Sequence, residues 1–270
     1  MKHPLFRIDY GPAFRAARIE RRTLVVPAAL KAFHGRSILF MTDLHLSPMF
    51  PERALLRLLA QAAALKPDIL CLGGDLAETG ADQVRAVALL GALRPALGAF
   101  AVLGNNDCEH MDGGGCPLPE ALRCIGVQTL VDAEAVLELP GGRLRVAGLN
   151  VLQAETAPPA PFFADAGEED LRLLMAHYPK SILRHRDDCA RLPHLALAGH
   201  THGGQFRFLG LTPYSIGFER RKYSRQLPVE GWTEVPGFPL LISPGVGTSR
   251  LPFRLNVPPT IHLITISAAR

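Results

Sequence analysis

Short apolar runs alternate with amphipathic patterns through the first half of the chain. The alternation predicts strands at 37–41, 68–72 and 99–103, with helices at 52–65 and 81–93. The strand runs are continuous and apolar, as in strands that are buried on both faces. Pro51 stands where the first helix begins, a position that tolerates proline. Because each run ends in a polar, glycine-containing loop, we expect these loops to meet at one edge of an α/β sheet.

The second half of the chain has a different pattern. After a helix at 117–125, strands are predicted at 127–131, 135–139, 144–149, 171–176, 194–198, 239–242 and 260–266. Pro140-Gly141-Gly142 is a hairpin signal, so this region is expected to be more antiparallel. Residues 168–170 are expected to start a short helix. The stretch 204–237 is long and irregular, which is typical of a functional loop or an insertion.

Length and composition favour a single domain. A chain of 270 residues with 48% hydrophobic content can bury one large core. We expect residues 36–270 to form the domain and residues 1–35 to be a basic extension that packs on it. No apolar stretch is long enough to predict a membrane span or a secretory signal. Five cysteines, an odd number, fit a reducing compartment, so the expected location is the cytoplasm.

The net charge of +4 is mild, but two basic clusters stand out. They lie at Arg15–Arg22 and at Arg220-Arg221-Lys222, and either could meet an anionic membrane or a substrate phosphate. A solvated face is the alternative. Peripheral attachment to the inner face of the cytoplasmic membrane therefore stays open. No nucleic-acid partner is expected, because the clusters are small and lack interleaved aromatic residues. The oligomeric state stays open.

Seven oxygen and nitrogen donors lie where predicted strands pass into loops. They are Asp43, His45, Asp75, Asn105, His177, His200 and His202. Each motif alone occurs by chance in many proteins, but the combination indicates a pair of metal ions. Mixed carboxylate, amide and imidazole donors suit manganese, iron or zinc better than magnesium or calcium. Two such ions about 3.5–4 Å apart can activate water and stabilise a phosphoryl transition state, which favours hydrolysis of a phosphorus ester.

The order of these motifs resembles that of the calcineurin-like metallophosphoesterases. That family carries Asp-x-His, Gly-Asp, Gly-Asn-His-Asp/Glu, a lone His and Gly-His-x-His, and the resemblance runs from residue 36 to residue 267. A bacterial branch of small phosphodiesterases is similar at Gly199–Gln205, Gly245–Ser249 and Asn256–Pro259. The resemblance implies a four-layer αββα sandwich, in which two mixed β-sheets pack face to face between helices. It places a binuclear metal site at the carboxyl ends of the strands.

The resemblance also implies which residues hold each metal ion. One ion would take Asp43, His45, Asp75 and His202, and the other would take Asp75, Asn105, His177 and His200. Asp75 would bridge them. Two divalent ions are therefore the expected cofactors, with Mn2+ favoured and Zn2+ or Fe as alternatives.

Asn106 departs from the family pattern, which has a histidine at this position. That histidine is thought to protonate the leaving oxygen, whereas a carboxamide has no useful proton. General acid catalysis is worth about 10²–10⁴-fold, so we expect substrates with good leaving groups, such as phosphoanhydrides or activated diesters. Alternatively, Asp107, Glu109 or His110 supplies the proton, or Asn106 orients the phosphate as a hydrogen-bond donor.

The substitution narrows the candidate substrates. Similar family members with another residue at this position include pyrophosphohydrolases that cleave UDP-2,3-diacylglucosamine, so a nucleotide-linked lipid is the leading candidate. Phe162 and Phe163 would then face acyl chains, with core packing as the alternative, while Arg220, Arg221 and Lys222 would reach a phosphate. A general or cyclic-nucleotide phosphodiesterase is the near alternative. A catalytically silent metal- or phosphate-binding module is the alternative of a different class.

Overall fold

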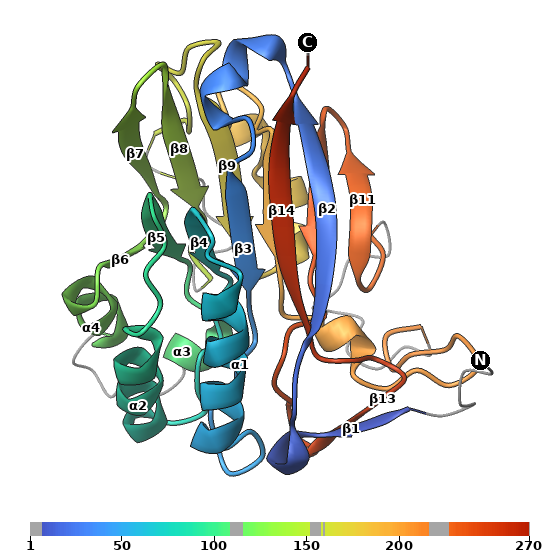
Figure 1. Cartoon of the computed structure of the whole chain (residues 1–270). Helices are drawn as coiled ribbons and strands as arrows, with labels where there is room; N and C mark the ends of the chain where they lie inside the picture. The colour runs from blue at the N-terminus through green and yellow to red at the C-terminus, as the bar shows by residue number, and fades with distance from the viewer. Residues whose placement is uncertain (1–6, 109–115, 152–157, 159, 216–226, 270) are drawn as a thin grey trace.

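Two six-stranded β-sheets form the centre of the fold (Figure 1). The computed structural model describes residues 7–108, 116–151, 158, 160–215 and 227–269. In spatial order, the first sheet contains β2 (Arg18–Val26), β14 (Thr260–Ala268), β3 (Ser37–Met41), β4 (Ile69–Leu72), β5 (Gly98–Ala101) and β6 (Val127–Thr129). The second contains β11 (Gly231–Val235), β12 (Phe238–Ile242), β10 (Leu195–Ala198), β9 (Leu171–Ala176), β8 (Gly142–Gly148) and β7 (Ala133–Leu139).

Both sheets are mixed, as the family resemblance implies. In the first, β3 to β6 run parallel, while β14 is antiparallel to β3. In the second, β8, β9, β10 and β12 run parallel, and β7 and β11 pair antiparallel at the two edges. A separate two-stranded sheet joins β1 (Ile8–Tyr10) to β13 (Phe253–Leu255). The helices are α1 (Glu52–Ala64), α2 (Gly80–Leu90), α3 (Asn105–Cys108), α4 (Leu118–Cys124) and α5 (Pro179–Arg184).

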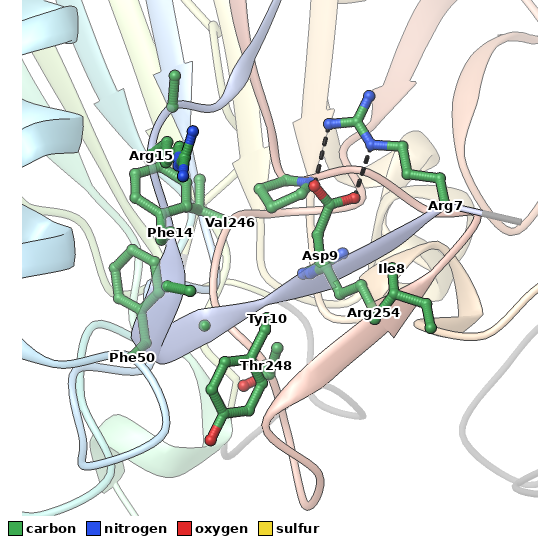
Figure 2. Close-up of a pocket in the computed structure, with 14 residues that line it drawn as sticks. Arg7, Ile8, Asp9, Tyr10, Phe14, Arg15, Phe50, Val246, Thr248 and Arg254 are labelled. Carbon is green, nitrogen blue, oxygen red and sulfur yellow. Dashed lines mark hydrogen bonds and ion pairs between the residues drawn. The ribbon is translucent and has the colours of Figure 1, made fainter. Parts of the chain in front are cut away.

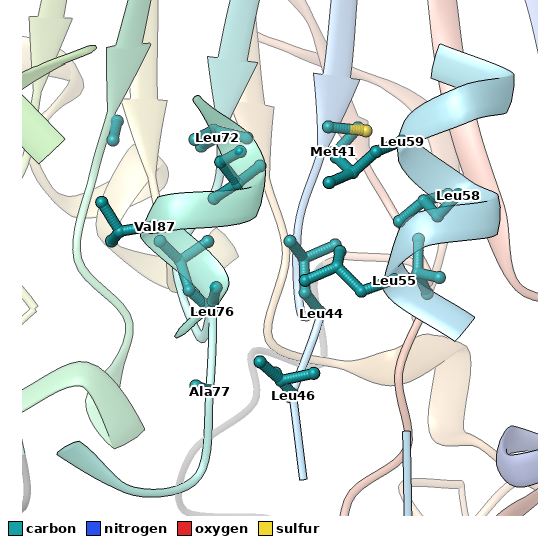
Figure 3. Packing of buried hydrophobic residues seen from close by; sticks show 14 of the residues in the cluster. Met41, Leu44, Leu46, Leu55, Leu58, Leu59, Leu72, Leu76, Ala77 and Val87 are labelled. Carbon is teal, nitrogen blue, oxygen red and sulfur yellow. The ribbon is translucent and has the colours of Figure 1, made fainter. Parts of the chain in front are cut away.

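The alternation of side chains along the buried strands produces the layers. In β3, Ile38 and Phe40 belong to the cluster between the two sheets, whereas Leu39 and Met41 belong to the cluster beneath the helices. Figure 3 shows the cluster beneath the helices, with Leu59 of α1 beside Met41. A third cluster covers the outer face of the second sheet and includes Ile182 of α5. The expected four-layer αββα sandwich is therefore confirmed.

The N-terminal region differs from the expected extension in one respect. Residues 18–26 form β2, which pairs in parallel with β14 along its full nine-residue length. Arg21 and Arg22 are exposed on this edge strand, while Leu24 and Val26 are buried in the core between the sheets. Charged residues are common on edge strands, because they discourage pairing with other chains. The arginines that suggested a basic extension thus lie partly on a strand of the domain.

The prediction that a short helix starts at residues 168–170 is wrong. These residues form a turn before β9, in which the Asp170 carboxylate accepts a hydrogen bond from the backbone N–H of Gly167 at 2.8 Å. The same carboxylate pairs with Arg143 and Arg145, so it stabilises a turn instead of a helix. The irregular stretch 204–237 contains β11 at its end. No helix among the described residues combines the length and apolar character needed to span a bilayer.

Candidate metal centre

The predicted ligands lie in loops that follow strands of both sheets. Asp43 and His45 follow β3, Asp75 follows β4, and Asn105 begins α3 after β5. His177 follows β9 of the second sheet, and His200 and His202 follow β10. Within each sheet the parallel strands end at a common edge, and the face-to-face packing of the two sheets brings both sets of loops to one place. The site is therefore assembled from segments that are far apart in the sequence.

The first group of predicted ligands comprises Asp43, His45 and His202, whose donor atoms lie within 4.8 Å of one another. Nε2 of His202 is 3.5 Å from Oδ1 of Asp43 and 3.1 Å from Nε2 of His45. All three side chains are buried. Carboxylate and imidazole donors that face one another in a buried cavity form an environment suited to a divalent cation.

The second group comprises Asp75, His177 and His200, again within 4.8 Å. Nε2 of His177 lies 3.3 Å from Oδ2 of Asp75 and 3.2 Å from Nδ1 of His200. The same Oδ2 of Asp75 lies 3.5 Å from Nε2 of His45, so Asp75 joins the two groups. This is the position expected for a bridging carboxylate.

The donor set fits two cations. Unprotonated ring nitrogens that face each other, as in the His45–His202 and His177–His200 pairs, would repel through their lone pairs unless a proton or a cation lies between them. A metal ion in each group satisfies these nitrogens and the adjacent carboxylates together. The structure therefore supports a pair of metal positions on either side of Asp75.

The backbone at the ligands adopts an unusual conformation. Five ligands have a positive φ angle, and these are Asp43 (53°), His45 (47°), Asp75 (53°), His200 (69°) and His202 (52°). Such angles are uncommon for residues with a side chain, and they concentrate at functional sites. Gly104 allows the close packing that this needs, because a side chain there would overlap the Asp75 carboxylate. Local backbone strain thus accompanies the inward orientation of the ligands.

Hydrogen bonds to the outer ring nitrogens orient three of the histidines. Nδ1 of His177 lies 2.8 Å from the Gly73 carbonyl oxygen, and Nδ1 of His45 contacts the Glu78 carboxylate. Both contacts leave Nε2 facing the centre, as is usual for histidine ligands. Nη2 of the buried Arg254 lies 3.2 Å from Nδ1 of His202. Sequence reasoning did not identify Glu78 or Arg254, although Glu78 stands only three residues after Asp75.

Neighbouring charges shift the pKa values of the ligands in opposite directions. Burial disfavours the charged form of Asp75, but His177 and His45 outweigh it and hold the pKa of Asp75 far below its ordinary value. Burial opposes protonation of His177, but Asp75 and Asp43 outweigh it and raise the pKa of His177 to about 10. Burial, with His45 and Arg254 nearby, lowers the pKa of His202 well below its usual value. The low pKa of His202 thus favours the neutral imidazole, which is the form that binds a metal ion.

Asn105 and Asn106 lie at the edge of the cluster. Oδ1 of Asn105 accepts a hydrogen bond from the Tyr178 hydroxyl at 3.3 Å, and the Tyr178 ring packs edge-on against His200. The backbone N–H of Asn106 donates to Oδ1 of Asp75 at 2.9 Å, and its side-chain nitrogen lies 3.3 Å from Nδ1 of His45. Both asparagines therefore contact residues of the candidate metal-binding groups or residues that pack against them.

Asp107 holds the ligand loops together. Its carboxylate accepts hydrogen bonds from the backbone N–H groups of Asp75 (2.7 Å), Leu76 (2.9 Å) and Gly104 (2.8 Å). Burial and the charge of Asp75 raise its pKa to about 7. Since these contacts occupy the carboxylate, the structure gives Asp107 a positioning role in the loops.

The structure does not bring the other predicted site residues to the cluster. Phe162 and Phe163 are buried beneath the outer face of the second sheet, with Leu174 and Phe238 in the same core cluster, which matches the core-packing alternative. Glu109, His110, Arg220, Arg221 and Lys222 lie outside the described residues.

Comparisons with known proteins agree with this geometry. Residues 36–204 match the family model of the calcineurin-like phosphoesterases. An uncharacterized metallophosphoesterase of Aquifex aeolicus is 28% identical, with 92% of this chain and 91% of the relative aligned. Phosphodiesterase YaeI of Escherichia coli is 29% identical, with 85% of this chain and 81% of the relative aligned. YpbG of Bacillus subtilis is 28% identical, with 85% and 80% aligned. The chain therefore belongs to the calcineurin-like phosphoesterase family and is a metal-dependent phosphoesterase.

Proposed function

We propose that this enzyme hydrolyses phosphodiester or phosphoanhydride bonds whose leaving group departs without a proton from Asn106. The observation that carries the proposal is the placement of the Asn106 amide beside the ligand cluster. Its nitrogen donates to Oε2 of Glu78 at 3.2 Å, and its oxygen accepts from the side chain of Asn105 at 2.6 Å. An amide so held donates hydrogen bonds but supplies no acidic proton. A phosphate leaving group, with a second pKa of about 6, departs as an anion.

The charge balance of the site suits an anionic substrate. Only Asp43 and Asp75 among the seven donors carry negative charge, so two divalent ions would leave an excess of positive charge. The ions, with manganese our leading candidate, would supply Lewis-acid activation of water and charge stabilisation. Asp43, His45 and His202 would hold one of them. Asn105, His177 and His200 would hold the other, and Asp75 would be shared by both.

The surrounding residues position this set. Glu78 and Gly73 fix the rings of His45 and His177, so both present Nε2 to the centre. Tyr178 positions Asn105 through its hydroxyl and His200 through its ring. The Asn106 backbone N–H keeps one oxygen of Asp75 occupied, which directs the other oxygen between the two groups. The protein thus orients the donors before a substrate arrives.

Within this reaction class we favour a phosphoanhydride, with a nucleotide-linked lipid such as UDP-2,3-diacylglucosamine as the candidate. An activated or cyclic-nucleotide diester is the second candidate, because one relative bears the name phosphodiesterase. The two differ in the acidity of their leaving groups. A substrate series graded by leaving-group pKa therefore tests the proposal directly.

The test uses full-length protein loaded with Mn2+. Rates would be measured on an aryl diester, an alkyl diester, a sugar nucleotide and UDP-2,3-diacylglucosamine. Rates that fall steeply as the leaving-group pKa rises are expected, and equal rates on alkyl and aryl diesters would overturn the proposal. Asp75→Asn should lose both bound metal and turnover. The exposed Asp187→Asn serves as its control, since that side chain is 87% exposed.

A further inference from the structure

The small sheet of β1 and β13 presents an apolar face. Its antiparallel register sets Ile8 opposite Leu255 and Tyr10 opposite Phe253. Residues directly opposite each other in such a pair project to the same side. Ile8 is 66% exposed and Tyr10 is 49% exposed, so this side of the sheet is open to solvent. Figure 1 shows the small sheet set apart from the two large ones.

A tight hairpin extends this face. The Phe206 ring packs on Phe253, and the backbone N–H of Arg207 donates to the Leu255 carbonyl oxygen at 2.8 Å. Immediately after, Phe208 and Leu211 exchange two backbone hydrogen bonds of 2.9 Å around a two-residue turn. We define the apolar platform as the exposed residues on these segments, together with Leu251 two residues before β13: Ile8, Tyr10, Phe208, Leu209, Leu211 and Leu251.

The tip of the hairpin has an unexpected residue. Leu209 has a φ of 48° and Gly210 a φ of 82°, angles that two-residue hairpin turns usually fill with asparagine, aspartate or glycine. Leu209 is also 87% exposed, so it gains little from packing within the chain. A leucine with a positive φ and an exposed side chain lowers the stability of the chain on its own. Its presence indicates that the side chain contacts an apolar partner outside the chain.

The segments that carry the platform contain more basic than acidic residues. Residues 7–15, 205–211 and 249–256 contain a single acid, Asp9, against five arginines, which are Arg7, Arg15, Arg207, Arg250 and Arg254. Arg254 is buried, Arg7 pairs with Asp9 and Arg207 pairs with Glu230, so the positive charge exposed on these segments comes mainly from Arg15 and Arg250. Figure 2 shows Arg15 and Tyr10 on the walls of a cavity of about 410 Å³ beside this sheet. Apolar tips flanked by arginines match the surface of an anionic bilayer, which offers acyl chains beneath phosphate groups.

We propose that the apolar platform docks on an anionic lipid bilayer, with Phe208 and Leu209 entering the boundary between headgroups and acyl chains. Docking would set the metal centre near the membrane. Phe206 follows His202 by only four residues, and the Gln205 side chain donates to the carbonyl oxygens of Leu251 and Phe253 at 3.0 Å. Gln205 thus ties the platform to the loop that carries His202. This inference concerns the docking surface and holds for any phosphoester substrate.

The experiment measures binding of the metal-loaded full chain to vesicles by sedimentation. Vesicles of phosphatidylglycerol with phosphatidylcholine would be compared with pure phosphatidylcholine. The test variants are Leu209→Asn alone and together with Phe208→Gln. Asparagine favours the positive φ at this turn, so the hairpin should keep its shape. Leu56→Gln is the matched control, because Leu56 is an exposed leucine on α1, outside the platform.

The wild-type chain should bind anionic vesicles more strongly than neutral ones, and added salt should weaken that binding. Leu209→Asn should lower the partition coefficient about tenfold or more, as expected for losing one buried leucine, while Leu56→Gln should leave it unchanged. Turnover of a water-soluble aryl diester should stay the same in all variants, which separates this test from that of the proposed function. Absent vesicle binding, or equal loss with Leu56→Gln, would overturn the proposal. A third outcome would also overturn the proposal: the chain does not bind vesicles, sediments as a dimer without lipid, and becomes a monomer in Leu209→Asn. The platform would then serve self-association.

Discussion

The side-chain amide of Asn106 donates a hydrogen bond of 3.2 Å to Oε2 of Glu78. An imidazole at position 106 would meet the same carboxylate, which would stabilise its protonated form. We therefore expect Asn106→His to accelerate hydrolysis of alkyl diesters by up to about 10²-fold, because it supplies a general acid. Aryl diesters, whose leaving groups need no proton, serve as the internal control. Equal rates for the variant and the wild type on alkyl diesters would contradict our interpretation of Asn106.

Glu78 should matter through His45. Glu78→Gln replaces the carboxylate that contacts Nδ1 of His45, and such changes beside a histidine ligand typically weaken metal binding by about 10–100-fold. Manganese titration by calorimetry measures the change. The control is Glu138→Gln, which alters an exposed glutamate on β7. If both variants bind manganese as the wild type does, Glu78 has no role in holding the ring.

Gly104 should accept no side chain. In Gly104→Ala the new methyl group would overlap the Asp75 carboxylate and its backbone nitrogen. Overpacking of this kind costs about 1–3 kcal/mol, so we expect metal affinity to fall about tenfold or more. Gly80→Ala is the control, because a methyl group there meets open space at the start of α2. Metal content after dialysis distinguishes the two variants, and retention of both ions by Gly104→Ala would refute the packing argument.

Metal binding should release protons near neutral pH. In the metal-free protein the pKa of His177 is raised to about 10, so its ring carries a proton at pH 7 that a metal ion must displace. Affinity should therefore rise with pH up to about 10. Calorimetry in buffers of different ionisation enthalpy should show release of about one proton from this group. The exposed His34→Gln should leave that number unchanged, and buffer-independent heats would count against the prediction.

Asp170 should make stability sensitive to acid. Burial disfavours its charge, but Arg143, the Gly167 N–H and Arg145 outweigh this and lower its pKa to about 2. An unfolded aspartate titrates near pH 3.9. The contribution of the charged Asp170 to the free energy of unfolding is therefore complete above about pH 4 and is lost as the pH falls through about 2. Asp170→Asn should unfold more easily at pH 7, by about 1.5–3 kcal/mol, and show a weaker acid dependence. Chemical denaturation across this range, with Asp187→Asn as control, gives the answer.

The sequence predicts the strands of the buried layers well because their signal is local. In β3 and β4 every residue is apolar or small, both faces are covered, and the ligand motif follows directly. The convergence of Asp43 and Asp75 also follows from strand order, because β3 and β4 are parallel neighbours that end at a common edge of one sheet. The ligand motifs and the fold class thus come from short-range patterns.

Other features depend on partners that are distant in sequence. β2 presents Arg21 and Arg22 to solvent, so its pattern lacks the continuous apolar run of a central strand, and only its pairing with β14 makes it a strand. Arg254 is fully buried against the His202 loop, a fact that no local pattern at 254 could indicate. The pairing of Glu78 with His45 likewise depends on how two loops meet.

The division of the ligands between the two sheets has a mechanical consequence. The spacing of the His177 and Asp75 donors is set by how the two sheets stack. The packing of Ile38, Phe100 and Met175 between the sheets therefore fixes the distance between the two proposed metal positions. Removing a methylene from that layer would let the halves slide against each other. A core substitution between the sheets could then change which metal ion binds, although every coordinating residue is unchanged.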